Sequence, residues 1–142
     1  MPQSTLTKEE IDALIALLDG NIQSAKRYKK LYRVAVRDAA LVALLLEGIT
    51  TKEVIELRRA DLSFSDLLVN PKWGSRRRVK INDVTRKYLD LYLEDAEDEQ
   101  TLLLVNQRGS PLTPRLVRRV TRGLGEQLGI RLYPGRLIAS HQ

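Results

Sequence analysis

Hydrophobic and polar positions follow helical spacing along much of this chain, most clearly within residues 102–130. A short apolar, strand-like run and a Gly-containing turn lead to Thr113, a good N-cap, and Pro114, which fits the first helical position. At about 100° per residue, the next segment divides into two faces and predicts an amphipathic helix. The apolar face holds Leu116, Val117, Val120, Leu124 and Leu128, and the opposite face holds Arg115, Arg118, Arg119 and Arg122.

Four further segments carry helix signals. A capping box at residues 7–10 opens a helix that Gly20 and Asn21 should end. Residues 34–47 are apolar nearly all round, which indicates a central core helix that Gly48 ends. A second capping box at residues 50–53 starts a short helix through Leu57, and Asn82 caps another helix.

The periodicity changes between these last two helices. Leu62–Phe64, Leu67–Val69 and Arg77–Ile81 are short runs of β character, so we expect a small three-stranded antiparallel sheet. The acid-rich residues 94–99 are typical of a solvated loop. The order of elements predicts an α+β, mainly helical fold. A chain of 142 residues is long enough to bury its own core, so we expect a single domain over residues 1–142.

The net charge of +6 lies entirely in the last third of the chain. Residues 101–142 hold seven arginines and one acid, Glu126, whereas the first 100 residues hold seventeen basic and seventeen acidic side chains. Such asymmetry is typical of proteins that contact nucleic acid or a membrane surface. A helix with a merely solvated basic face would show the same pattern.

Several classes of protein are disfavoured by composition. The chain has no cysteine and a single histidine, His141, so we expect no disulfide, no thiol nucleophile and no metal site. We also expect no cofactor and no small-molecule substrate. The longest apolar run, Ala39–Leu46, is too short to span a bilayer, and the first residues lack an apolar signal region. We therefore expect a cytoplasmic protein, associated with the nucleoid if the source is a prokaryote.

Several strings, in their order, resemble the catalytic domain of the tyrosine recombinase (phage integrase) family. They run from Leu6 to the last residue. LTKEEIDALIALL resembles the domain start, and RDAALVALLLEGITTKEVIELRRADLSF resembles the core helix through the first strand. NQRGSPLTPRLVRRVTRGLGEQLGI resembles a late turn and helix, and LYPGRLIAS resembles the start of the second catalytic cluster. The resemblance implies a tyrosine-recombinase-like fold and a partner that is double-stranded DNA.

Family members cut DNA with a tyrosine that forms a covalent phosphotyrosine, assisted by arginines, a lysine and histidines. The resemblance puts the first arginine at Thr50 and the His-x-x-Arg pair at Gly135 and Ile138, so these positions are vacant. Lys72 matches the lysine, and the sequence ends before the family's tyrosine. Losing one charge contact in such a site costs about 10²–10³ in rate. The resemblance therefore implies a catalytically inactive domain, shorter at its C-terminus than the family's.

What the resemblance leaves is a surface for holding DNA. Each candidate on the hairpin has an alternative interpretation. Lys72 could be an ordinary surface lysine, and Trp73 would pack over the sheet more readily than insert into the DNA minor groove. Arg76, Arg77 and Arg78 could protect the edge of a strand against aggregation. The expected DNA-binding residues are Lys72, Arg76, Arg77 and Arg78 on the hairpin, with Arg115, Arg118, Arg119 and Arg122 on the late helix.

Two functional hypotheses follow. The first is a noncatalytic DNA-binding protein that regulates transcription or assists recombination of a mobile element. The second is a protein-interaction module that accepts a tail segment from an active recombinase, from another copy of itself or from another partner. An active enzyme would need an unconventional nucleophile.

Overall fold

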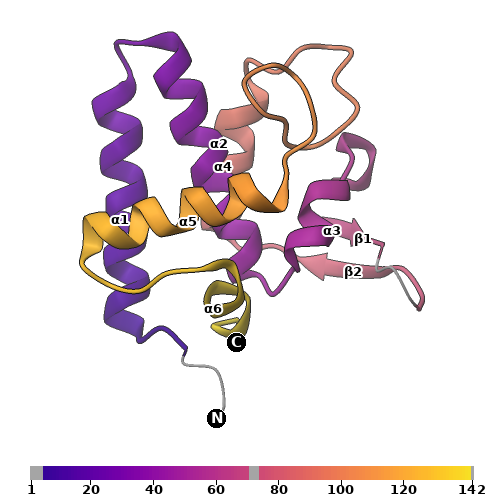
Figure 1. The fold of residues 1–142 in the computed structure, drawn as a ribbon. Coiled ribbons are helices and arrows are strands. Elements are labelled where there is room, and N and C mark those ends of the chain that lie inside the picture. Colours follow the sequence, from indigo (N-terminus) through magenta and orange to yellow (C-terminus); the bar gives the residue numbers. More distant parts are fainter. Residues whose placement is uncertain (1–4, 71–73, 142) are drawn as a thin grey trace.

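The computed structural model describes residues 5–70 and 74–141. A helix-rich body carries a two-stranded hairpin at one side (Figure 1). In chain order the elements are α1 (Lys8–Ala25), α2 (Lys29–Leu46), α3 (Thr51–Glu56), the 3-10 helix η1 (Arg59–Asp61), β1 (Asp66–Val69), β2 (Arg77–Lys80), α4 (Asp83–Leu93), α5 (Pro114–Leu128) and α6 (Pro134–Ala139).

Helix α2 is the centre of the core. It packs against α1, α3, α4, α5 and α6, and every residue from Val36 to Leu45 except Asp38 is buried. Helix α5 crosses in front of α1 and α2 in Figure 1. The prediction of a central core helix is confirmed, and its all-round hydrophobicity reflects neighbours on every side.

Most predicted helix ends are confirmed. Both capping boxes form, Thr7 with Glu10 and Thr50 with Glu53, and the Asn82 side chain accepts a hydrogen bond from the Thr85 N–H. Gly48 follows α2 with φ at 85°, a left-handed conformation that glycine adopts without a steric cost. A Cβ at this position would also lie 2.9 Å from Cδ2 of His141, so glycine lets the chain end approach α2.

The predicted end of the first helix at Gly20 and Asn21 is wrong, because α1 continues to Ala25. Ile22 extends the buried stripe of Leu14 and Leu18 by one more turn. Burying an isoleucine side chain gains about 1.5–3 kcal/mol, which exceeds the roughly 1 kcal/mol cost of a glycine inside a helix. Helix α2 likewise begins earlier than expected, at Lys29 rather than Val34.

The predicted three-stranded sheet is also wrong, because the sheet has two strands, β1 and β2, paired antiparallel with Leu67 opposite Val79. Leu62 contributes only an isolated bridge to Leu67. The chain turns sharply there, with the Ser63 N–H donating to the Asp66 carbonyl. The Ser63 and Phe64 carbonyls accept from the Arg86 guanidinium, so this segment lacks the groups to pair as a strand.

The apolar run at residues 102–105 does not form a strand, although Leu103, Leu104 and Val105 are buried. It makes isolated bridges from Leu102 to Arg58 and from Val105 to Pro111. Among the helices that the structure describes, none combines the length and hydrophobicity needed to cross a membrane.

Candidate nucleic-acid interface

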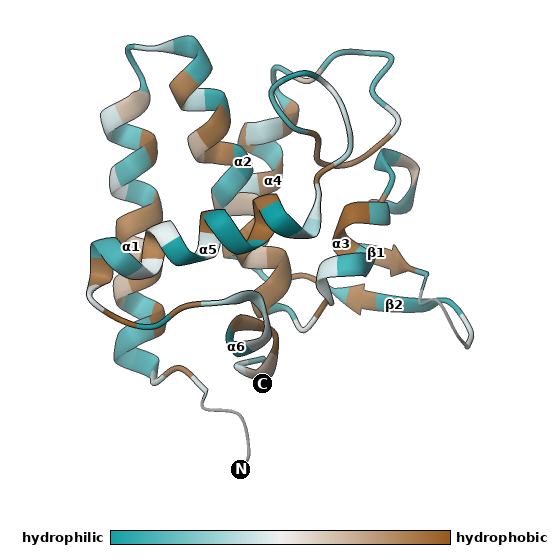
Figure 2. Ribbon diagram, viewed as in Figure 1, coloured by the Kyte–Doolittle hydropathy of each residue, from teal (hydrophilic) through white to brown (hydrophobic). Residues whose placement is uncertain are grey.

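The two predicted faces of α5 are confirmed. Val117 and Leu124 are buried in the core, and Leu116, Val120 and Leu128 pack against it. Figure 2 shows the resulting alternation of hydrophilic and hydrophobic residues along the helix. The four arginines Arg115, Arg118, Arg119 and Arg122 are all exposed on the opposite face.

The chain folds back along α5 after the helix ends and lies close to it at Gly125. A Cβ at Gly125 would come within 2.7 Å of both the Ile130 carbonyl oxygen and the Leu132 Cβ, so only glycine permits this approach without a shift. The Ile130 N–H donates to the Gly125 carbonyl across the same contact, at 2.9 Å. Residues 130–133 therefore form a wall beside the arginine face.

Between this wall and α5 lies a hollow of about 550 Å³, which we call the arginine hollow. Five guanidinium groups line it, together with a single acid, Glu126. Neighbouring positive charges of this density, with one carboxylate among them, create a surface that favours an anionic ligand. The lining residues are Arg115, Arg118, Arg119, Arg122, Glu126, Ile130, Arg131, Leu132 and Tyr133.

Arg131 is a member of this hollow that the sequence did not indicate. Its guanidinium carbon lies 5.4 Å from the centre of the Tyr133 ring, a cation–π geometry that orients the side chain. The sequence signal was limited to one more arginine in the basic last third. Its placement depends on the chain reversal after α5, which residue periodicity does not report.

The hairpin arginines occupy three different environments. Arg77 makes two hydrogen bonds to the buried carboxylate of Glu53 on α3, with N–O distances of 2.7 and 3.1 Å. These bonds hold the pKa of Glu53 below its ordinary value of 4.5, against the opposing effect of burial. Arg76 donates to the Asn70 side chain, whereas Arg78 is exposed and has no ion pair with any described residue. Lys72 and Trp73 lie outside the described residues.

Helix α3 lies between the hairpin and α5. Glu53 of α3 binds Arg77 of β2, and α3 also packs against α5 (Figure 1). The structure thus places the two predicted groups of arginines on elements that border the same short helix.

The three positions that the resemblance marks as vacant lie near the C-terminal end of α2. The Thr50 hydroxyl accepts from the Glu53 N–H at 3.2 Å and serves as the N-cap of α3. Gly135 and Ile138 lie on α6, which packs against α2, and Ile138 contacts the hydrophobic core. His141 follows α6, with Nδ1 3.3 Å from the Leu46 carbonyl oxygen.

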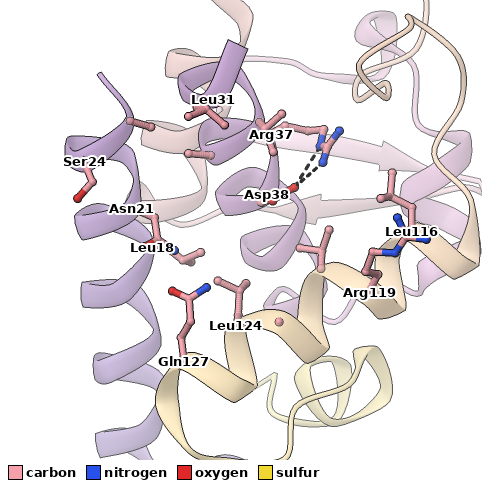
Figure 3. Close-up of a pocket in the computed structure, with 15 residues that line it drawn as sticks. Leu18, Asn21, Ser24, Leu31, Arg37, Asp38, Leu116, Arg119, Leu124 and Gln127 are labelled. Carbon is pink, nitrogen blue, oxygen red and sulfur yellow. Dashed lines mark hydrogen bonds and ion pairs between the residues drawn. The ribbon is translucent and has the colours of Figure 1, made fainter. Parts of the chain in front are cut away.

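A second depression lies between α1, α2 and α5, with a volume of about 540 Å³ (Figure 3). Its lining is mostly apolar and includes Leu31, Leu116 and Leu124. At its edge Arg37 donates two hydrogen bonds to Oδ1 of Asp38, and burial raises the pKa of that carboxyl while Arg37 opposes the rise. We call this depression the three-helix groove.

Comparison with known proteins identifies the class. The model of the phage integrase family matches residues 4–142. Tyrosine recombinase XerC of Bacillus subtilis (strain 168) is 31% identical over 109 residues, which cover 69% of this chain and 36% of the relative. Tyrosine recombinase XerD of Oceanobacillus iheyensis is 27% identical over 135 residues, covering 88% of this chain and 42% of the relative. The chain therefore belongs to the phage integrase family.

Solved structures confirm the mainly helical α+β fold of a tyrosine recombinase catalytic domain. The XerH site-specific recombinase bound to difH substrate superposes with a TM-score of 0.77 at 22% identity, covering 97% of this chain and 41% of that one. The Tn1549 transposon integrase in complex with circular intermediate DNA superposes with a TM-score of 0.69 at 18% identity, covering 99% and 51%. The chain thus spans 36–51% of the length of these four proteins.

Proposed function

We propose that these 142 residues form a domain that binds double-stranded DNA. The observation that carries the proposal is the arginine hollow, which five arginines and a single acid line. A guanidinium is permanently charged and offers a planar fork of donors that matches two phosphate oxygens. Phosphate contacts provide most of the affinity of sequence-independent DNA binding. The DNA complexes of XerH and the Tn1549 integrase support the same partner.

The hairpin would add to this surface unequally. Both Arg77 and Arg78 are exposed, but Arg77 is engaged with Glu53, whereas Arg78 has no ion pair with a described residue and can meet a phosphate. Arg77 would therefore contribute long-range attraction more than a direct contact. Lys72 stays a predicted contact on the same hairpin.

We also propose that the domain does not catalyse strand transfer. Three positions that the resemblance assigns to catalysis hold residues without a charge or an acid–base group, namely Thr50, Gly135 and Ile138. The Thr50 hydroxyl is committed to a helix cap, and Ile138 packs on the core. A domain of this kind would act as a transcriptional regulator or as an accessory factor in recombination.

The test compares two variants that each remove one exposed positive charge, Arg118→Ala on α5 and Lys8→Ala at the start of α1. Fluorescence anisotropy with a labelled duplex would measure affinity at several salt concentrations. We expect the wild type to bind at low salt and to weaken as salt rises, Arg118→Ala to bind more weakly, and Lys8→Ala to match the wild type. Absent or salt-insensitive binding, or equal effects of the two variants, would refute the proposal.

The three-helix groove supports a second candidate function, a module that accepts a tail segment from another subunit. Its apolar lining offers a hydrophobic segment more buried area than a flat surface would. Size exclusion with light scattering, with and without an active recombinase of the family, distinguishes the two. A stable complex with the recombinase and no affinity for DNA would favour the module over the DNA-binding domain.

A further inference from the structure

Two exposed segments of opposite charge lie at the end of the molecule where α2 begins. We call residues 26–31, which connect α1 to α2 and form the first residues of α2, the basic corner, and residues 94–99, which follow α4, the acidic loop. All their charged side chains are exposed, and none of them belongs to an ion pair among the described residues. The basic corner holds Lys26, Arg27, Lys29 and Lys30, and the acidic loop holds Glu94, Asp95, Glu97, Asp98 and Glu99.

The packing of α2 against α4 brings these segments to the same end of the molecule. The two helices run antiparallel, because the Asn82 N–H before α4 donates to the Glu47 carboxylate after α2, at 2.7 Å. At the other end, the Arg33 guanidinium lies 5.4 Å from the centre of the Tyr92 ring. The second turn of α2 therefore lies beside the end of α4, and both charged segments lie at the top of Figure 1.

The basic corner also exposes apolar area. Tyr28 is 60% exposed and Leu31 is 58% exposed, two of the three large hydrophobic side chains in the described part of the chain that are strongly exposed. The third, Phe64, lies elsewhere, in the turn before β1. Exposed aromatic and aliphatic groups next to charged side chains are typical of a surface that another protein covers.

A partner that covers both segments must place negative charge opposite the basic corner and positive charge opposite the acidic loop. DNA on the basic corner would bring its phosphates against five carboxylates of the acidic loop, and a purely cationic partner would meet the basic corner. A second copy of this chain, related by a two-fold axis, sets each basic corner opposite an acidic loop, since the same patch meets itself in such an interface. We propose that the chain self-associates through this end.

The association should be weak and sensitive to salt. Each pair of exposed charges stabilises an interface only slightly, and salt screens such pairs over a Debye length of about 10 Å at 0.1 M. The pairs repeat twice in a two-fold dimer, which makes the combined effect measurable at high protein concentration. The arginine hollow is not part of this surface, so self-association and DNA binding can fail independently.

The experiment is sedimentation equilibrium of the 142-residue chain without DNA, at salt concentrations of about 20 mM and about 500 mM. At low salt the average mass should rise with protein concentration toward twice the 16.2 kDa of one chain, and at high salt it should stay at one chain. Two charge-reversal variants, Lys29→Glu/Lys30→Glu and Glu97→Lys/Asp98→Lys, should each remain single chains. Glutamate is favourable in the first turn of a helix, so the first variant should fold, which circular dichroism checks.

Mixing the two variants gives the decisive readout, because each mixed pair brings the unaltered acidic loop of one variant opposite the unaltered basic corner of the other, a pairing that neither variant can make with itself. We expect the 1:1 mixture to associate at low salt more strongly than either variant alone and more weakly than the wild type, because only one of the two sides regains its full charge pairing. Failure of the mixture to associate, or no rise in mass of the wild type, would overturn the proposal. So would loss of association in Arg118→Ala/Arg119→Ala, which would mean that the acidic loop docks on α5 instead. Weaker DNA binding by Lys29→Glu/Lys30→Glu with an unchanged mass would assign the basic corner to DNA.

Discussion

Arg77 on β2 forms a two-pronged ion pair with Glu53 on α3, with Nη1 2.7 Å from Oε2 and Nη2 3.1 Å from Oε1. The same carboxylate accepts from the Thr50 N–H at 3.0 Å, so one buried side chain both caps α3 and anchors the hairpin. A carboxylate buried in this way is costly once its partner is removed. The pair therefore links the hairpin to the helical body.

Removing Arg77 should weaken the fold. We expect Arg77→Ala to lower the free energy of unfolding by about 1–2 kcal/mol near neutral pH, a moderate value because the arginine side chain is still 43% exposed. Urea denaturation measures the change. Arg78→Ala, which removes an exposed neighbour on the same strand, is the matched control and should change stability little. Equal stability of the two variants would mean that the pair contributes nothing.

The same pair predicts a pH dependence. The pKa of Glu53 is lowered in the folded protein, mainly by the Arg77 hydrogen bonds. The contribution of the ionised Glu53 to the free energy of unfolding is therefore fully present above pH 4.5, the ordinary pKa of the group. This contribution is lost as the pH falls through the lower pKa that Glu53 has in the folded protein. The stability difference between the wild type and Arg77→Ala should shrink below pH 4.5, and urea titrations across this range test it. A difference that grows on acidification would contradict this account.

Replacing several arginines of α5 should change the salt dependence of DNA binding as well as the affinity. The logarithm of the binding constant falls with the logarithm of salt concentration by about 0.9 for each neutralised phosphate. If Arg115, Arg118 and Arg119 each contact one phosphate, their combined replacement by alanine should reduce the slope by about 2.7. Anisotropy titrations from low to moderate salt give both slopes. An unchanged slope would place the phosphate contacts elsewhere.

The chain should form no covalent complex with DNA. Incubation with nicked suicide substrates followed by a denaturing gel would trap a phosphotyrosine if one formed, and an active recombinase of the family with its own site provides the positive control. Because Thr50, Gly135 and Ile138 offer no charged or acid–base side chain, we expect no adduct. A protein–DNA band that survives denaturation would show strand cleavage and contradict this prediction. Replacing each tyrosine in turn would then identify the nucleophile.

Two glycines on α5 should respond in opposite ways to the same change. Gly125→Ala places a Cβ 2.7 Å from Ile130 O and Leu132 Cβ, so we expect a loss of about 1–3 kcal/mol of stability and displacement of the hollow's wall. Gly123→Ala meets nothing within 4 Å and should stabilise the helix by about 1 kcal/mol. Thermal unfolding distinguishes them. Similar melting temperatures would mean that residues 130–132 move away without cost.

The helices were largely predictable because their signals are local. The Thr113 cap, Pro114 and the spacing of leucines and arginines specify α5 within one segment, and capping boxes specify the starts of α1 and α3. The end of α1 was misjudged because the burial of Ile22 outweighs Gly20, and burial depends on what packs against the helix. The prediction of a third strand was wrong for a similar reason. Arg86, more than twenty residues away in the sequence, binds the Ser63 and Phe64 carbonyls that a strand would use for pairing.

The helical pattern, the concentration of net positive charge in the last third and the resemblance to an integrase domain could all be derived from the sequence, because each depends on residues near one another in the chain. Packing in three dimensions settled which charges act together. It paired Arg77 with Glu53, brought Arg131 to the arginines of α5 and set the basic corner at the same end of the molecule as the acidic loop. Contacts between distant segments arise from packing around α2, and no local periodicity encodes which side chains that packing will bring together.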